Sequence, residues 1–152
     1  MGAEQKLKEM GLMLPEQATA VGNYVPAVRV GNLLFVSGHG PFKDDQIKIA
    51  GKLGRDLTVE EGYKVARNVT MNCLASIRSV LGDLDKVKRF VKLLGMVNCT
   101  EDFKEQPKVI NGCSDLLVEL FGDSGKHARS AVGMQALPFE IPVEIEMILE
   151  VE

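Results

Sequence analysis

Arg129 has the residue type and the setting that most clearly suggest chemistry in this sequence of 152 residues. It stands in the segment HARSAVG, an otherwise apolar stretch that follows a turn bounded by Gly122 and Gly125. A guanidinium group presents its N–H donors in a rigid plane, so it can hold a carboxylate through two parallel hydrogen bonds. The alternative is an arginine at a strand end that pairs with a surface glutamate. Arg129 is therefore a candidate for binding a carboxylate ligand.

Three glutamates near the C-terminus could supply an acid or a base. They alternate with apolar residues, so all three should lie on one face of a strand: Glu144, Glu146 and Glu150. A carboxylate beside a cleft can orient a water molecule or relay a proton. The alternative is a solvated acidic strand face, because residues 140–152 contain five acidic residues and no basic one. The alternation does not choose among the three, and Glu144 is the candidate at the start of the strand.

Five further residues could contact a ligand. Ser37, Gly38 and His39 end a predicted strand, where a glycine lets the backbone approach a ligand closely and a histidine could exchange a proton near neutral pH. Tyr24 lies in a loop, and its phenol could donate a hydrogen bond or stack on a small molecule. Asn111 lies roughly opposite the apolar side of a predicted helix, so it is solvated unless another subunit covers it. The alternative for residues 37–39 is an ordinary turn, and the alternative for Tyr24 is a half-buried ring without a ligand.

Common cofactor and metal signatures are missing from the sequence. Lys126 is followed by His127 where a phosphate-binding loop needs Ser or Thr, and Lys43 stands where a dinucleotide fingerprint needs its last glycine. The chain has 2 histidines and 3 cysteines with no C-x-x-C pair, which fits neither a zinc site nor a disulfide framework. The net charge of −3 argues against a nucleic-acid-binding surface. We expect no cofactor, no metal and no nucleic-acid partner.

The elements that must position these residues follow from hydrophobic periodicity. A capping box of Thr58 and Glu61 begins a long amphipathic helix that ends at Gly82, and a second helix runs from Pro107 to Gly122. A short helix is predicted from Glu4 to Leu14, where Pro15 ends it. The remaining apolar or alternating runs predict strands at residues 28–37 (two strands broken by a turn at 31–32), 46–50, 87–99, 129–137 and 143–151.

The predicted order is β-β-β-α-β-α-β-β in a single domain of residues 1–152, with residues 1–21 as an N-terminal extension. Two helices on one face of a mostly antiparallel sheet make a two-layer α+β fold. The other sheet face would be partly uncovered and available as an oligomer interface. No stretch is apolar and long enough to span a membrane, and the unpaired cysteines favour a reducing compartment, so we expect a cytoplasmic protein.

The last two strands were expected to form a hairpin around residues 138–142, with Ala136 opposite Glu144. Arg129 would then lie roughly 23 Å along its strand from the level of Glu144, too far for one small ligand to touch both. We therefore predict that the two residues meet across a subunit boundary.

Three segments of the chain resemble the reactive intermediate deaminases, the RidA or YjgF-like family, which also carries the older label endoribonuclease L-PSP. The resemblance extends from about Gly22 to the C-terminus and rests on these runs: GNYVPAVRVGNLLFVSGHGP, EDFKEQPKVINGCSDLLVELFG and ARSAVGMQALPFEIPVEIEMILEV. The last run is the most specific. The longer N-terminus resembles the long branch of this family.

The resemblance implies a chorismate-mutase-like fold and a homotrimer with clefts between subunits. It also implies hydrolysis of 2-imino acids such as 2-iminobutanoate and 2-iminopropanoate, with their enamine tautomers, to 2-keto acids and ammonia, without a cofactor or metal. In this reading Arg129 holds the substrate carboxylate and Glu144 positions water. Cleft positions fall on Tyr24, Ser37, Gly38 and Asn111.

The chain departs from the family pattern at two further positions near these residues. Ala131 stands where the family often has a cysteine, and His39 where it often has a polar amide, so the substrate can differ even if carboxylate binding is kept. Two rival functions stay open. One is a non-catalytic trimer that binds small carboxylates and regulates a partner, and the other is the endoribonuclease or translation inhibitor of the older label.

Overall fold

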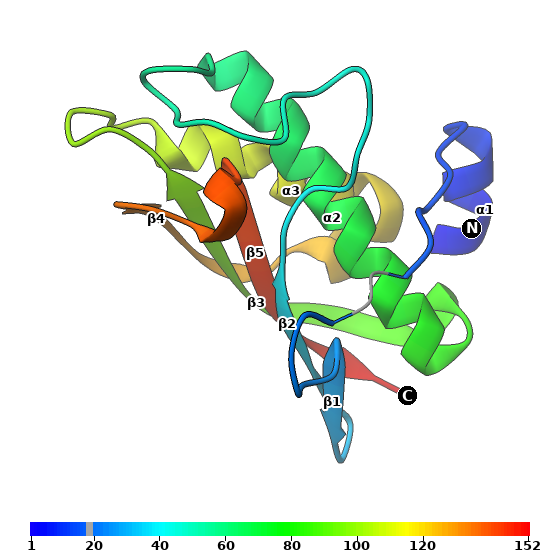
Figure 1. Cartoon of the computed structure of the whole chain (residues 1–152). Coiled ribbons are helices and arrows are strands. Elements are labelled where there is room, and N and C mark those ends of the chain that lie inside the picture. Colours follow the sequence, from blue (N-terminus) through cyan, green and yellow to red (C-terminus); the bar gives the residue numbers. More distant parts are fainter. Residues whose placement is uncertain (18–19) are drawn as a thin grey trace.

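The protein is a five-stranded sheet covered on one face by two long helices (Figure 1). The computed structural model describes residues 1–17 and 20–152. The strand order is β1-β2-β5-β3-β4, and every neighbouring pair is antiparallel except β3 and β4. The strands are β1 (Ala27–Val30), β2 (Leu33–His39), β3 (Val87–Asn98), β4 (Ala128–Met134) and β5 (Val143–Val151). The expected two-layer α+β architecture is confirmed.

Helix α2 (Val59–Leu81) begins and ends where the sequence indicates. The Thr58 side chain accepts a hydrogen bond from the Glu61 amide, and the Glu61 side chain accepts one from the Thr58 amide. These two bonds satisfy donors that the first helical turn leaves free. Gly82 follows the last turn with φ of 85°, a left-handed conformation that suits glycine.

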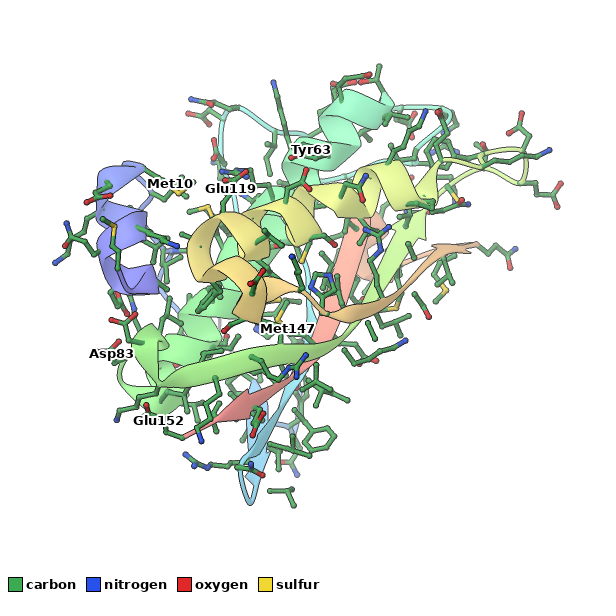
Figure 2. All side chains as sticks on the ribbon, turned by 180° about the vertical axis from the view of Figure 1, so that it is seen from behind. Met10, Tyr63, Asp83, Glu119, Met147 and Glu152 are labelled. Atoms are coloured by element: carbon green, nitrogen blue, oxygen red, sulfur yellow. The ribbon has the colours of Figure 1, made fainter. Side chains whose placement is uncertain are left out.

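Helix α3 (Gln106–Phe121) connects β3 to β4 and makes these two strands parallel. Its Gly112 lies so close to α2 that a side chain there would collide with the Tyr63 carbonyl oxygen. On the outer surface of the helix pair, the Tyr63 hydroxyl donates to Asp115 at 2.7 Å, and Arg67 pairs with Glu119 at 2.9 Å (Figure 2). The helix pair therefore holds β4 at the sheet edge in a fixed place.

A short N-terminal helix, α1 (Ala3–Glu9), packs beside the end of α2 (Figure 1). Leu7 is buried, and the Glu4 carboxylate accepts a hydrogen bond from the Leu84 amide and lies 3.4 Å from Arg78. The helix ends earlier than the sequence pattern predicts, at a turn over Met10 and Gly11. No helix in the described part of the chain combines the length and apolarity needed to cross a membrane.

The helices cover one face of the sheet, and the opposite face is partly exposed to solvent. On β5 the residues that face the helices are fully buried, and they are Val143, Ile145, Met147, Leu149 and Val151. The opposite face carries Glu144, Glu146 and Glu150, as the alternation predicts. It also carries large apolar side chains that no element in the described part of the chain covers, including Val28, Phe35 and Val132, which are 51%, 42% and 37% exposed.

Two sequence-based predictions of strands are wrong. Residues 46–50 form no strand, because the Gln46 amide donates to the Asp44 carboxylate and the Ile47 amide to the Asp44 carbonyl, which closes a turn. The last two strands form no hairpin, because β3 lies between β4 and β5. β4 stops at Met134, and a short 3-10 turn at Pro138–Glu140 leads the chain across to β5. The crossover through α3 gives β4 a parallel partner that local sequence cannot reveal.

Candidate active site

Arg129 projects from β4 toward α3, on the helix-covered side of the sheet. Its Nη1 donates to the Asn111 Oδ1 at 2.8 Å and to the Ser114 Oγ at 3.1 Å. None of the ion pairs among the described residues, taken as N···O within 4.0 Å, includes Arg129. Within the described part of one chain Arg129 therefore pairs with no glutamate, and neutral oxygens hold the cation.

The free edge of the Arg129 guanidinium has the geometry of a carboxylate clamp. The two Nη1 hydrogens are occupied by Asn111 and Ser114, which leaves the Nε hydrogen and both Nη2 hydrogens. No residue in the described part of the chain accepts from these three. The Nε and Nη2 donors point the same way and match the two oxygens of a carboxylate.

The surroundings of Arg129 include two residues that the sequence reasoning missed, Ser114 and His127. The Ser114 Oγ lies 2.9 Å from the His127 Nε2, and the His127 Nδ1 lies 2.6 Å from the Gly125 carbonyl oxygen. Asn111 itself is half-buried with its amide oxygen on the arginine. Ser114 comes three residues after Asn111, so the helical repeat puts both on one face, and this was the available signal.

Glu144 lies on the opposite face of the sheet, beside Gly38 of β2. A Cβ at position 38 would collide with the Glu144 Oε2, so the missing side chain makes room for the carboxylate. Glu144 is half-buried, and this burial, together with the nearby charge of Glu146, raises its pKa. A carboxylate with a raised pKa holds a proton more readily and suits a role in proton transfer.

His39 is buried behind this group, where both of its nitrogens are occupied. The Nδ1 lies 2.6 Å from the Ser37 carbonyl oxygen, and the Nε2 lies 2.7 Å from the Ser76 Oγ on α2. Burial lowers the His39 pKa, and the hydrogen bond to Ser37 opposes that shift in part. The ring is thus neutral and engaged, and it ties the end of β2 to α2.

A small cavity of about 130 Å³ brings four of the predicted residues together at the end of β2. It is lined by Ala20, Tyr24, Pro26, Ser37, Gly38, His39, Gly40 and Asn72. Ser37 donates its hydroxyl hydrogen to the Val25 carbonyl at 2.7 Å, so its oxygen can only accept from a ligand. Tyr24 is 53% exposed on the rim. The cavity admits a ligand of a few heavy atoms and is smaller than sites for drug-sized molecules.

The predicted residues form two groups within one chain. Arg129 is in register with Leu93 and Glu144 with Met96, so they lie three residues apart along the strands and two strands apart across the sheet. This corresponds to about 14 Å between Cα atoms, which replaces the longer separation expected from a hairpin. The two side chains also project from opposite faces. That they meet across a subunit boundary stays a prediction.

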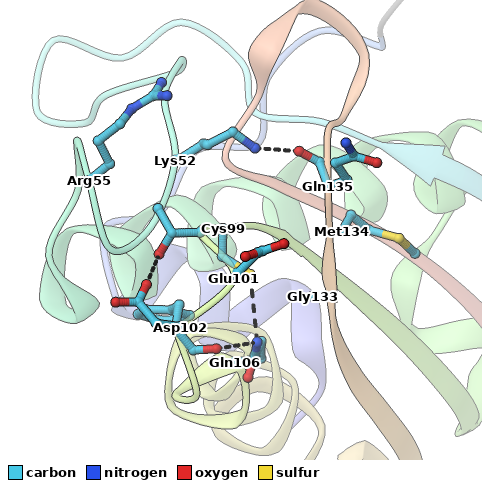
Figure 3. A pocket seen from close by; sticks show the side chains of 11 residues that line it. Lys52, Arg55, Cys99, Glu101, Asp102, Gln106, Gly133, Met134 and Gln135 are labelled. Carbon is cyan, nitrogen blue, oxygen red and sulfur yellow. Dashed lines mark hydrogen bonds between the residues drawn. The ribbon is translucent and has the colours of Figure 1, made fainter.

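A larger cavity, of about 1040 Å³, lies elsewhere, at the carboxyl ends of the parallel strands β3 and β4 (Figure 3). It contains none of the predicted site residues. Lys52 Nζ donates to the Asn98 Oδ1 at 2.7 Å and to the Gln135 carbonyl, and Gln106 Nε2 donates to the Phe103 carbonyl at 3.0 Å. Acidic and basic groups both line it, and many of its polar groups bond to one another, so it offers no clear charge preference.

The cysteines and the acidic residues show no nucleophile or metal site. Cys73 and Cys113 are fully buried, and burial raises the pKa of Cys73 well above its usual value and that of Cys113 to about 12. Both thiols therefore stay protonated and unreactive. Among the residues described, no cluster of three or more His, Cys, Asp or Glu side chains could hold a metal ion.

Comparison with known proteins identifies the family of this chain. Residues 4–149 match the family model described as "YjgF/chorismate mutase-like, putative endoribonuclease". The protein TCP17 of Trypanosoma cruzi is 43% identical over 145 residues, which cover 95% of this chain and 91% of that protein. This match extends over nearly the whole chain.

Solved structures show the same fold. The protein Atu1372 of Agrobacterium tumefaciens, whose function is unknown, superposes with a TM-score of 0.88 at 43% identity, covering 98% of this chain and 91% of that one. RidA from an Antarctic Psychrobacter superposes with a TM-score of 0.55 at 28% identity, covering 90% and 94% of the two chains. The chain therefore belongs to the YjgF/RidA family.

Proposed function

We propose that the protein hydrolyses reactive 2-imino acids, with their enamine tautomers, to 2-keto acids and ammonia. The observation that carries this proposal is the arginine with a free carboxylate-binding edge. Arg129 is half-buried, oriented by Asn111, and without an acidic partner among the described residues. Membership of a family that includes proteins named RidA supports the same reaction class.

In the proposed reaction Arg129 holds the substrate carboxylate, which fixes the adjacent C=N carbon in place. Glu144 accepts a proton from a water molecule as the water oxygen bonds to that carbon, and the C=N nitrogen takes up a proton. The resulting carbinolamine collapses after its amino nitrogen takes up a proton: the hydroxyl gives its proton to Glu144, the C=O of the keto acid forms, and the C–N bond breaks with its electron pair leaving on ammonia. The raised pKa of Glu144 favours this passage of a proton between oxygen and nitrogen.

Residues at the end of β2 would receive the nitrogen of the substrate. The Ser37 oxygen can accept a hydrogen bond from the developing amine, since its own hydrogen is given to Val25. The glycine at position 38 lets Glu144 reach the same place. No metal or cofactor is needed for these steps, because imine hydrolysis involves only water and proton transfer.

The proposed active unit is a homotrimer in which Arg129 of one subunit faces Glu144 of the next. Two observations support it. The two residues lie on opposite faces of one sheet, and the face that carries Glu144 also exposes Val28, Phe35 and Val132 to solvent in the single chain. A patch of this kind is typical of a surface covered by another protein molecule. Light scattering after gel filtration would measure the assembly.

The decisive experiment measures keto acid and ammonia formed from an imine that an amino-acid oxidase generates. We expect acceleration by the wild type and its loss, by about a hundredfold or more, in Arg129→Ala with an unchanged circular dichroism spectrum. Full activity in Arg129→Ala would contradict the assignment. A protein that binds 2-oxobutanoate without releasing ammonia would instead be the regulatory module, and a metal-free preparation that degrades RNA would support the older label.

A further inference from the structure

We propose that Ser114 and His127 are positioning residues that fix the Arg129 guanidinium so that its Nε and Nη2 edge is presented to the carboxylate. The inference rests on the proposed function, since it concerns how that carboxylate is bound. It adds two residues to the site that do not touch the ligand themselves.

The direction of each hydrogen bond around Ser114 can be assigned. Arg129 can only donate, so the Ser114 Oγ at 3.1 Å is the acceptor. The His127 Nδ1 lies 2.6 Å from the Gly125 carbonyl oxygen, which can only accept, so this nitrogen carries a proton. In the neutral ring the Nε2 is then an acceptor, and it takes the Ser114 hydroxyl hydrogen across 2.9 Å. From donor to acceptor, the hydrogen bonds therefore run from Arg129 to Ser114, from Ser114 to His127, and from His127 to the Gly125 carbonyl.

The far end of this chain of bonds is rigid. Gly125 is buried, and a side chain there would collide with the Leu117 carbonyl oxygen of α3. The loop that supplies the Gly125 carbonyl is therefore pressed against the helix that carries Ser114. His127 is held between two parts of one packed unit and cannot turn without breaking both bonds.

The arrangement restricts the arginine more than Asn111 could alone. Asn111 and Ser114 are three residues apart on α3 and occupy the two hydrogens of one nitrogen, Nη1. With both taken, tilting and sideways displacement of the guanidinium plane are opposed from two sides. A guanidinium held in advance loses less conformational freedom when the ligand binds.

The experiment compares Ser114→Ala and His127→Phe with two conservative variants, Ser114→Thr and His127→Gln, which keep a hydroxyl and an acceptor at the same places. The KM for the imine and the dissociation constant for 2-oxobutanoate are measured for each. For Ser114→Ala and His127→Phe we expect both constants to rise about tenfold with kcat changed less than twofold. Ser114→Thr and His127→Gln should stay within about threefold of the wild type.

The matched control is Ser79→Ala, the same change on α2, where the hydroxyl donates to Gln17 far from β4. It should leave both constants unchanged. The dissociation constant separates the two proposals. If Arg129→Ala binds 2-oxobutanoate as the wild type does, the proposed function fails. If Arg129→Ala loses binding while Ser114→Ala and His127→Phe keep it, the function stands and the positioning role is wrong.

The guanidinium signals of Arg129 in nitrogen-15 NMR give a second readout that needs no turnover. In the wild type the Nη1 hydrogens, which are bonded to Asn111 and Ser114, should exchange slowly with solvent, and the guanidinium should rotate slowly. Ser114→Ala should speed both processes, and Ser114→Thr should restore them. Equal rates in the wild type and Ser114→Ala would overturn the inference even if the alanine variant were destabilised.

Discussion

The two histidines of this protein make the same pair of contacts in two different settings. Each has its Nδ1 at 2.6 Å from the carbonyl oxygen two residues earlier, and each has its Nε2 within 2.9 Å of a serine on a facing helix. His39 pairs with Ser76 of α2, and His127 with Ser114 of α3. The first bridge is buried and the second is half-buried.

What differs is the group beyond the serine. Ser76 lies in the core, and its bond to His39 leaves no buried side-chain nitrogen or oxygen without a partner there. Ser114 accepts in addition from Arg129 and so links the position of the histidine to the cation that we propose to bind the substrate carboxylate. The same local geometry therefore stabilises the fold in one place and, in our proposal, orients the ligand-binding arginine in the other.

The largest effect is expected for Gly38→Ala, which should alter the rate of the reaction, whereas changes near His127 should alter ligand binding. Gly38→Ala puts a methyl group where the Glu144 carboxylate lies, and the flexible carboxylate can move away at little cost to folding. We expect kcat to fall by about tenfold to a hundredfold with KM changed little. Ser114→Ala and His127→Phe should instead raise KM and change kcat little. Steady-state kinetics on Gly38→Ala would check this, and an unchanged kcat would place Glu144 outside the reaction.

The next effect concerns the buried contact between His39 and Ser76. Ser76→Ala removes the hydroxyl that lies 2.7 Å from the His39 Nε2 and leaves a buried acceptor without a donor. The free energy of unfolding should drop by about 1–3 kcal/mol. Ser114→Ala, where water can replace the hydroxyl, should lose less than about 1 kcal/mol. Urea denaturation of both variants measures the difference, and equal losses would mean that burial does not distinguish the bridges.

A smaller effect is the response of stability to pH. Burial keeps the His39 pKa below its usual 6.5, so below about that pH the unfolded chain binds a proton that the folded chain does not. The free energy of unfolding should therefore decrease as pH falls through 6.5 and below. His39→Gln should flatten this dependence in thermal unfolding between pH 5 and 8. A slope unchanged in His39→Gln would assign it to other groups.

The smallest effect should be a gain. The raised pKa of Glu144 means that ionised Glu144 opposes folding at neutral pH, while the protonated form does not. Glu144→Gln should raise the melting temperature by about 1–2 °C at pH 7 and have no such effect below pH 4.5. Imine hydrolysis should be lost in the same variant. A melting temperature that falls at pH 7 would show that the carboxylate contributes favourable contacts instead.

The elements were predictable where local signals agree. The capping box at Thr58 and the apolar periods of α2 and α3 predict both helices to within one or two residues, and the alternation in β5 predicts which of its side chains face the helices. The third predicted strand was wrong because the alternating run at residues 46–50 is short, and the Asp44 turn decides its conformation. The predicted pairing of β4 with β5 was wrong because the place of β4 in the sheet depends on the crossover through α3.

The site was predictable in its residue types but not in its contacts. Arg129 stands out as a polar residue in an apolar strand, and its motif matches a family. His39 looked like a free acid or base, yet tertiary packing places its ring against Ser76 in the core. His127 was set aside with the metal-site hypothesis, since no local pattern links it to Ser114, thirteen residues earlier. Such pairings arise only when β4 returns beside α3.

The close approach of the Glu144 carboxylate to Gly38 couples two positions that are distant in the sequence. A larger residue at position 38 is compatible with the fold only if the acid at position 144 becomes shorter or turns away, so the two should change together among descendants of this protein. A glycine-to-alanine change at 38 followed by glutamate-to-aspartate at 144 would be the simplest route. Drift at this pair would retune the reaction while the rest of the sheet stayed as it is.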